Sequence, residues 1–253
     1  MTRSGPLARS YPGAVALVIC ALVPFLMLTT AVLPVSSMIA ANIGMSPKRF
    51  DVVVAMSDAA YAVGSVLAVQ LAQHFRQRRL LLMYAIAFAV ASALSVWAPT
   101  AWIFAAAFIV QGLCTSLMLI AAVPPLVTGW TVGKLPVTVL VMNLCIFGAV
   151  SIGPTLGAVQ ADAHHWRPLF GVVAASSILA VGLVLLTFDD DDPADQEAPW
   201  DLFAVLGAAV GCAAAFFGAG YLEGYRVVAA RSLVPLCVGT ALIVLLVVHQ
   251  YRT

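Results

Sequence analysis

Apolar residues along this chain gather into eight long runs that short polar segments separate. The runs cover approximately residues 13–33, 50–72, 79–97, 101–123, 136–158, 168–187, 200–220 and 232–248. An α-helix needs about 20 mostly apolar residues to cross the hydrocarbon core of a bilayer. The first run continues to about Ala41, and Ser46-Pro47 is a typical start for the second helix. The pattern predicts an all-α, polytopic membrane protein with about eight transmembrane helices.

Composition supports the same class. The 253 residues are 63% hydrophobic and only 9% charged, whereas soluble domains carry roughly a quarter charged residues. The net charge of +1 offers no basic surface for a nucleic acid. The lipid bilayer is therefore the expected partner.

Candidate chemistry is sparse outside the membrane. The five cysteines all lie inside apolar runs, and the adjacent His164 and His165 have no matching acids or cysteines. The sequence contains no nucleophile–base arrangement, phosphate-binding loop or cofactor motif. We expect no metal, no cofactor and no enzymatic activity.

Orientation follows from the cationic residues of the short loops. An even number of spans places both termini on one side, where seven Lys and Arg residues face five on the other side. The segment with Arg76, Arg78 and Arg79 supplies most of this excess. We expect a multi-pass protein of the inner (plasma) membrane with cytoplasmic termini.

An acidic segment divides the chain. Residues 189–197 hold six acids and no base. A calcium loop is the alternative, but the segment lacks the required glycine and ligand spacing. We predict a six-helix bundle at 1–188, a solvated cytoplasmic linker at 189–199 and a two-helix extension at 200–253.

Asp58 is the one ionisable residue deep within a predicted span. It shares a helical face with Asp51, Tyr61 and Ser65. A carboxylate at mid-membrane costs about 2.5–3.5 kcal/mol on insertion scales, so we expect a proton or a partner there. Asp58 is the candidate for proton coupling; the alternative is a neutral carboxyl group that helps to pack the bundle.

Other polar or aromatic side chains recur along the first, second, fourth and fifth spans. The candidates for lining a cavity are Thr29, Thr30, Tyr61, Ser65, Gln111, Thr115, Asn143, Phe147 and Ser151. Such side chains also form hydrogen bonds between packed helices without any transport role. Both interpretations remain open.

The fifth span contains Gly148, Gly153, Pro154 and Gly157. Proline costs about 3 kcal/mol and glycine about 1 kcal/mol relative to alanine within a helix. The spacing Gly153-x-x-x-Gly157 is typical of close helix crossings. The stretch predicts a kinked, tightly packed helix, and an ordinary packing kink is the alternative to a functional one.

These motifs resemble the major facilitator superfamily, and specifically its fourteen-span drug:proton antiporter branch. Gly148-x-x-x-x-Gly-Pro-x-x-Gly157 is similar to the antiporter motif of that branch, and Trp166-Arg-Pro-Leu-Phe170 follows it as in the family. Gln111-Gly112 resembles the end of the family's fourth-helix motif. Asp201 and Glu223-Gly224 resemble its two-helix insert.

The sequence departs from the family pattern at several positions. Gln73 stands where the family has an acid in its loop between the second and third helices, and Arg76 stands where it has a glycine. Phe108 stands where the family has an arginine in its fourth helix, and the acid that many drug exporters have in their first helix would fall near the apolar Phe25. The basic end with Arg78 and Arg79 is retained. The resemblance leaves Asp58 as the candidate for proton coupling.

The resemblance implies a proton-coupled exporter of small amphipathic compounds, of which this chain supplies the amino-terminal part. It implies two halves with the substrate between them, so a second transporter half or self-association is expected. It also implies that Arg76, Arg78 and Arg79 contact the inner ends of neighbouring helices. The alternatives are a non-transporting membrane subunit and a metabolite symporter on the same fold.

Overall fold

Eight helices make up the described part of the chain in this computed structural model, which covers residues 10–128, 135–187, 199–222 and 230–252. They are α1 (Tyr11–Asn42), α2 (Pro47–His74), α3 (Gln77–Trp97), α4 (Ala101–Thr128), α5 (Leu135–Asp162), α6 (Arg167–Thr187), α7 (Leu202–Gly220) and α8 (Ala230–Arg252). Each is long and apolar enough to cross a membrane. The all-α prediction and its eight spans are confirmed. The acidic residues 189–197 and Glu223-Gly224 lie outside the described residues.

Local sequence explains how several helices begin and end. Pro47 is the first residue of α2 after Ser46, although the serine side chain forms no capping hydrogen bond. Helix α1 ends because Gly44 adopts a left-handed conformation with φ of 69°, which allows the Met45 N–H to donate to the Ala40 carbonyl at 2.8 Å.

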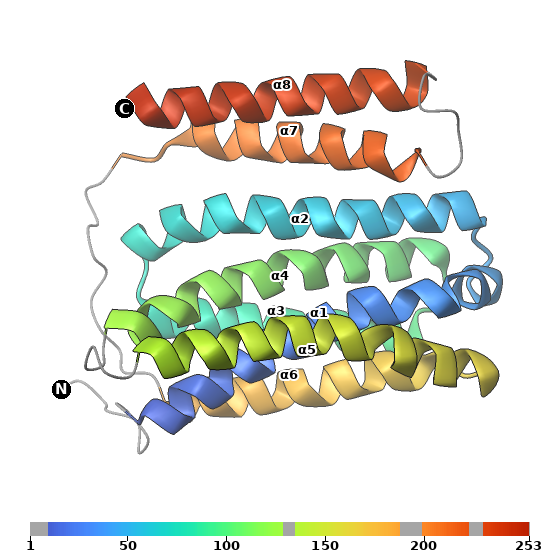
Figure 1. The fold of residues 1–253 in the computed structure, drawn as a ribbon, viewed down its shortest axis with the longest axis horizontal. Coiled ribbons are helices and arrows are strands. Elements are labelled where there is room, and N and C mark those ends of the chain that lie inside the picture. The colour runs from blue at the N-terminus through green and yellow to red at the C-terminus, as the bar shows by residue number, and fades with distance from the viewer. Residues whose placement is uncertain (1–9, 129–134, 188–198, 223–229, 253) are drawn as a thin grey trace.

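Helices α1 to α6 form one bundle (Figure 1), and its pairings repeat. Helix α1 packs along α5 and α2 packs along α4, while α3 packs along α6. If α1, α2 and α3 are exchanged for α4, α5 and α6 in that order, the pair of α1 with α5 becomes the pair of α4 with α2. The pair of α3 with α6 is unchanged. This is the arrangement of two inverted three-helix repeats.

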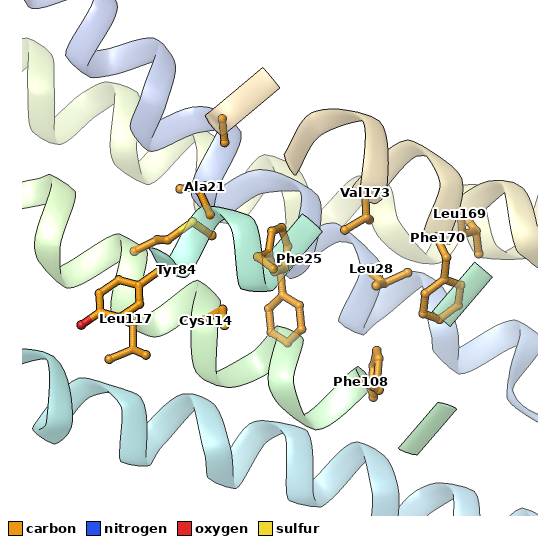
Figure 2. Packing of buried hydrophobic residues seen from close by; sticks show 14 of the residues in the cluster. Ala21, Phe25, Leu28, Tyr84, Phe108, Cys114, Leu117, Leu169, Phe170 and Val173 are labelled. Atoms are coloured by element: carbon orange, nitrogen blue, oxygen red, sulfur yellow. The ribbon is translucent and has the colours of Figure 1, made fainter. Parts of the chain in front are cut away.

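Aromatic side chains of α1, α4 and α6 form the centre of the core, as Figure 2 shows for Phe25, Phe108 and Phe170. Each of these three side chains is at most 1% exposed. In contrast, α3 exposes an apolar stripe that consists of Met83, Ile86, Val90 and Leu94. A helix bundle that is surrounded by lipid is expected to have apolar side chains both in its core and on its outer surface.

Helices α7 and α8 form a hairpin that lies beside α2 (Figure 1). The crossing within the hairpin is close, because a Cβ atom at Gly218 would lie 2.6 Å from the backbone nitrogen of Leu236. A Cβ atom at Gly220 would lie 2.9 Å from that of Ala55 on α2. Small residues thus allow α7 to pack closely against α8 on one side and against the six-helix bundle on the other.

Candidate functional site

A pocket of about 520 Å³ lies between α1, α2 and α7. Its walls are mainly apolar, and its polar side chains are those of Ser36, Asp51 and Asp58. The apolar lining consists of Val32, Leu33, Phe50, Val54, Ala55, Phe216, Ala219 and Gly220. The pocket thus combines an amphipathic lining with two carboxyl groups.

Asp58 is half-buried on the α2 wall of this pocket. Within the described residues, no side chain forms a hydrogen bond or ion pair with its carboxyl group. Ser36, across the pocket, donates its hydroxyl to the Leu33 carbonyl of its own helix at 2.9 Å. Asp58 is therefore placed to interact with whatever occupies the pocket.

Tyr61 and Ser65 follow Asp58 along α2 but lie in other surroundings. The Tyr61 ring stacks on Phe25, with centroids 6.3 Å apart and an interplanar angle of 5°. Ser65 lines a smaller pocket of about 250 Å³ between α2, α7 and α8. Asp58, Tyr61 and Ser65 therefore face three different environments along α2.

Gln111 and Thr115 lie inside the packed bundle and belong to neither of the two pockets described above. Both side chains have no exposed surface. The Gln111 amide donates to the Ser92 hydroxyl of α3 at 3.0 Å, and Thr115 donates to the Gln111 carbonyl at 2.8 Å. For Gln111, the structure thus favours the alternative of a hydrogen bond between helices.

The hydroxyl groups of Thr29 and Thr30 donate hydrogen bonds to backbone carbonyl groups of α1 itself. Thr29 donates to the Leu26 carbonyl at 2.9 Å, and Thr30 donates to that of Met27 at 3.1 Å. The Thr30 side chain faces Gly153 of α5. Thr30 therefore belongs to a helix contact.

Three candidates on α5 share an exposed face of the bundle. Phe147 is 66% exposed, and Asn143 and Ser151 are exposed as well. The Asn143 amide donates to the Val139 carbonyl at 2.9 Å. In the described residues these side chains face away from the bundle, which leaves them available to a substrate path or to another part of the protein.

The antiporter-like motif forms the crossing between α5 and α1. A Cβ atom at Gly153 would lie 2.6 Å from the Met27 carbonyl oxygen, and one at Gly157 would overlap the carbonyl oxygen of Ala31. Real Cβ atoms essentially never come that close to a backbone atom. Gly148, by contrast, has open space around it, and Pro154 is exposed. Two of the three glycines are therefore required for the close contact.

A matching crossing joins α2 to α4. A Cβ atom at Gly64 would lie 3.0 Å from the Leu113 carbonyl oxygen, and one at Gly112 would overlap that of Ser57. The Ser57 hydroxyl donates to the Phe108 carbonyl at 2.9 Å. Sequence reasoning missed this crossing, although Gly64 and Gly112 both interrupt apolar runs.

The basic segment 76–79, which ends the loop after α2 and begins α3, contacts α4 and α6. Arg78 donates to the Leu185 carbonyl near the end of α6 at 3.2 Å. Gln77, which sequence reasoning passed over, donates to the Ala121 carbonyl of α4. Arg79 is exposed, whereas Gln73 and Arg76 are half-buried.

A polar and aromatic junction fastens the hairpin to α2. The Asp201 backbone N–H donates to the Gln70 side-chain oxygen at 3.3 Å, and the Trp200 ring stacks on His74 with centroids 4.1 Å apart. The Asp201 carboxylate also accepts from the Ala204 N–H at 2.8 Å and lies 3.7 Å from His249 of α8. No sequence signal linked these distant positions.

Comparisons with known proteins agree with this architecture. The chain is 27% identical over 192 residues to the uncharacterized MFS-type transporter YubD of Bacillus subtilis (strain 168), a match that covers 75% of this chain and 38% of that protein. Its fold is similar to that of the POT family transporter PepTSo, with a TM-score of 0.59, 13% identity and coverage of 97% of this chain. It is also similar to the human organic anion transporter MFSD10 (TETRAN), with a TM-score of 0.53, 16% identity and coverage of 81% of this chain.

The chain spans 38% of the Bacillus protein, 52% of PepTSo and 55% of MFSD10. Its eight apolar helices indicate an integral, multi-pass membrane protein. The family model of the Major Facilitator Superfamily matches residues 17–247, which is nearly the whole sequence. The chain belongs to the Major Facilitator Superfamily of membrane transporters.

Proposed function

We propose that this chain supplies the amino-terminal part of a proton-coupled exporter of small amphipathic compounds, of the fourteen-span drug:proton antiporter branch. The observation that supports this proposal is the position of Asp58 in the amphipathic pocket between α1, α2 and α7. Apolar side chains such as Val54 and Phe216 would contact the body of a substrate, while the carboxyl group of Asp58 would contact its polar part.

The coupling mechanism follows from the cost of charge in a membrane. An ionised carboxylate at the centre of a span costs about 2.5–3.5 kcal/mol on insertion scales. Asp58 is therefore stable in this position when it carries a proton or when a substrate lies beside it. Mutually exclusive occupancy by proton and substrate is what an antiporter requires.

The geometry of the bundle gives the other candidate residues their proposed roles. Gly153 and Gly157 hold α5 close to α1, so that the two helices would tilt together when transporter halves rock about a site near the midplane. Arg78 would hold the start of α3 against the end of α6. The exposed face with Asn143, Phe147 and Ser151 would meet the second half or a second copy.

We further propose residues 1–188 as the six-helix bundle, residues 189–199 as a cytoplasmic linker and residues 200–253 as the two-helix extension. Helix α1 begins and α8 ends at the same end of the bundle (Figure 1), as an even number of spans requires. With Arg76, Arg78 and Arg79 on this side, the termini would lie in the cytoplasm and the bundle in the inner (plasma) membrane.

The test is a transport assay in liposomes with an imposed pH gradient and a panel of amphipathic dyes. The chain is assayed alone and together with any segment, encoded directly downstream, that adds about six spans. Asp58→Asn should abolish flux driven by the pH gradient, while Asp162→Asn, at an exposed position of α5, should not. Unchanged flux in Asp58→Asn removes Asp58 from the mechanism.

The same assay separates the alternative functions. Absence of flux from both forms favours a non-transporting membrane subunit. Transport of a metabolite in the same direction as the protons move favours a symporter.

A further inference from the structure

A groove of about 380 Å³ opens on the other side of the contact between α2 and α7. It lies where α2 and α4 begin and α7 ends, so it is at the end of the bundle opposite the loop with Arg78 (Figure 1). Its lining includes Arg49, Val52 and Val53 of α2, Trp102 and Ala105 of α4, and Tyr221. No function proposed above uses this groove.

The charge of this groove differs from that of the Asp58 pocket. Of the described residues that line it, Arg49 alone is charged. The Arg49 side chain is exposed, and among the described residues no hydrogen bond or ion pair to its guanidinium is recorded. A guanidinium is always charged and presents a planar set of donors that fits a phosphate group. The groove is therefore suited to an anion.

Its remaining surface is apolar and lies at the level where helices leave the membrane. Val52, Val53 and Ala105 continue from Arg49 toward the middle of the bundle. The Trp102 ring is 85% exposed at the first turn of α4. Tryptophan and tyrosine favour the headgroup level of a bilayer. A ligand of this groove would thus have a charged end beside Arg49 and an apolar end along Val53.

We propose that this groove binds a membrane phospholipid with a net anionic headgroup. The Arg49 guanidinium donates to the headgroup phosphate, and an acyl chain lies along Val52, Val53 and Ala105. Arginine and phosphate groups form charge-assisted hydrogen bonds that are frequently bidentate, and this pairing does not depend on which side of the membrane the groove faces. Because Tyr221 directly follows the end of α7, the bound lipid also joins the hairpin to α2 and α4.

Native mass spectrometry of the purified chain tests this proposal. The chain is titrated with phosphatidylglycerol and, separately, with phosphatidylcholine. Wild type should bind phosphatidylglycerol more tightly, and Arg49→Gln should weaken that binding about fivefold, the factor expected from the loss of one cation near the membrane surface. Arg49→Lys should retain most of the preference. The neighbouring Lys48→Gln, which removes an equal charge outside the groove, should leave it unchanged.

Two further measurements identify the ligand. Ala101→Trp adds a large side chain at a position that lines the groove and leaves its charge unchanged, so it should also weaken phosphatidylglycerol binding. Inorganic phosphate and glycerol phosphate should not displace the lipid, because neither has an acyl chain. The proposal is wrong if Arg49→Gln and Lys48→Gln have equal effects, if Ala101→Trp binds like wild type, or if free phosphate competes as well as the lipid does.

Discussion

Phe25 of α1 and Phe108 of α4 contact each other in the centre of the bundle, with ring centroids 6.3 Å apart. Both are essentially inaccessible, at 1% and 0% exposed. The resemblance to drug:proton antiporters implies an arginine at the position of Phe108 and an acid near that of Phe25. A buried ion pair can be replaced by well-packed apolar residues without loss of stability, whereas the loss of one partner alone is costly. Since Phe25 and Phe108 are both apolar, neither leaves an unpaired charge in the core.

Phe108→Ala is expected to destabilise the chain by about 3–5 kcal/mol, because it leaves a cavity beside Phe25, Phe104 and Phe170. Unfolding of the purified chain in mixed micelles measures this difference. Phe147→Ala, at an exposed position of α5, is the matched control and should change stability by less than about 1 kcal/mol. Equal effects of the two variants would show that the aromatic cluster is not the core.

Gly153→Ala is expected to force α5 away from α1, because its Cβ atom would overlap Thr30 and the Met27 carbonyl. A cost of about 1–3 kcal/mol is typical of such overpacking. Gly148→Ala is the control within the same helix, since nothing lies near its added methyl group, and it should be neutral or slightly stabilising. Thermal unfolding of both variants makes the comparison. A stable Gly153→Ala would mean that α1 and α5 do not cross as closely as the structure shows.

Asp201→Ala is expected to loosen the first turn of α7. The substitution removes the cap on the Ala204 N–H and the contact with His249, and loss of a helix cap costs about 1 kcal/mol. Hydrogen exchange of the α7 amides should accelerate severalfold, while the exchange of α2 amides stays constant. Asp162→Ala, in the last turn of α5, is the control. Unchanged exchange in α7 would remove Asp201 from the junction.

The parts of the fold that sequence predicted are those that depend on local composition. The eight spans follow from apolar runs, and Ser46-Pro47 marks the start of α2 because proline fits the first turn. The close crossing at Gly153 and Gly157 could be anticipated, because a glycine has no side chain and lets a neighbouring helix come close whichever helix that is. Such features need no knowledge of tertiary structure.

The environment of a polar side chain could not be predicted in this way. Periodicity places Gln111 and Thr115 on one face of α4, but it does not reveal that α3 covers this face. The pocket around Asp58 includes Phe216 and Gly220, which lie about 160 residues further along the chain. The junction of His74 with Trp200 also joins distant segments. These contacts depend on how the hairpin docks, and no local pattern encodes that.

The exchange of proton for substrate at Asp58 can be measured directly as proton release. The purified chain, with any downstream half that it requires, is mixed in weakly buffered solution with a dye that it transports, and a pH indicator records the change. We predict that binding of the dye to wild type releases protons, and that Asp58→Asn binds the dye without releasing any. Proton release of equal size from Asp58→Asn, or dye binding without release in wild type, would contradict antiport through Asp58.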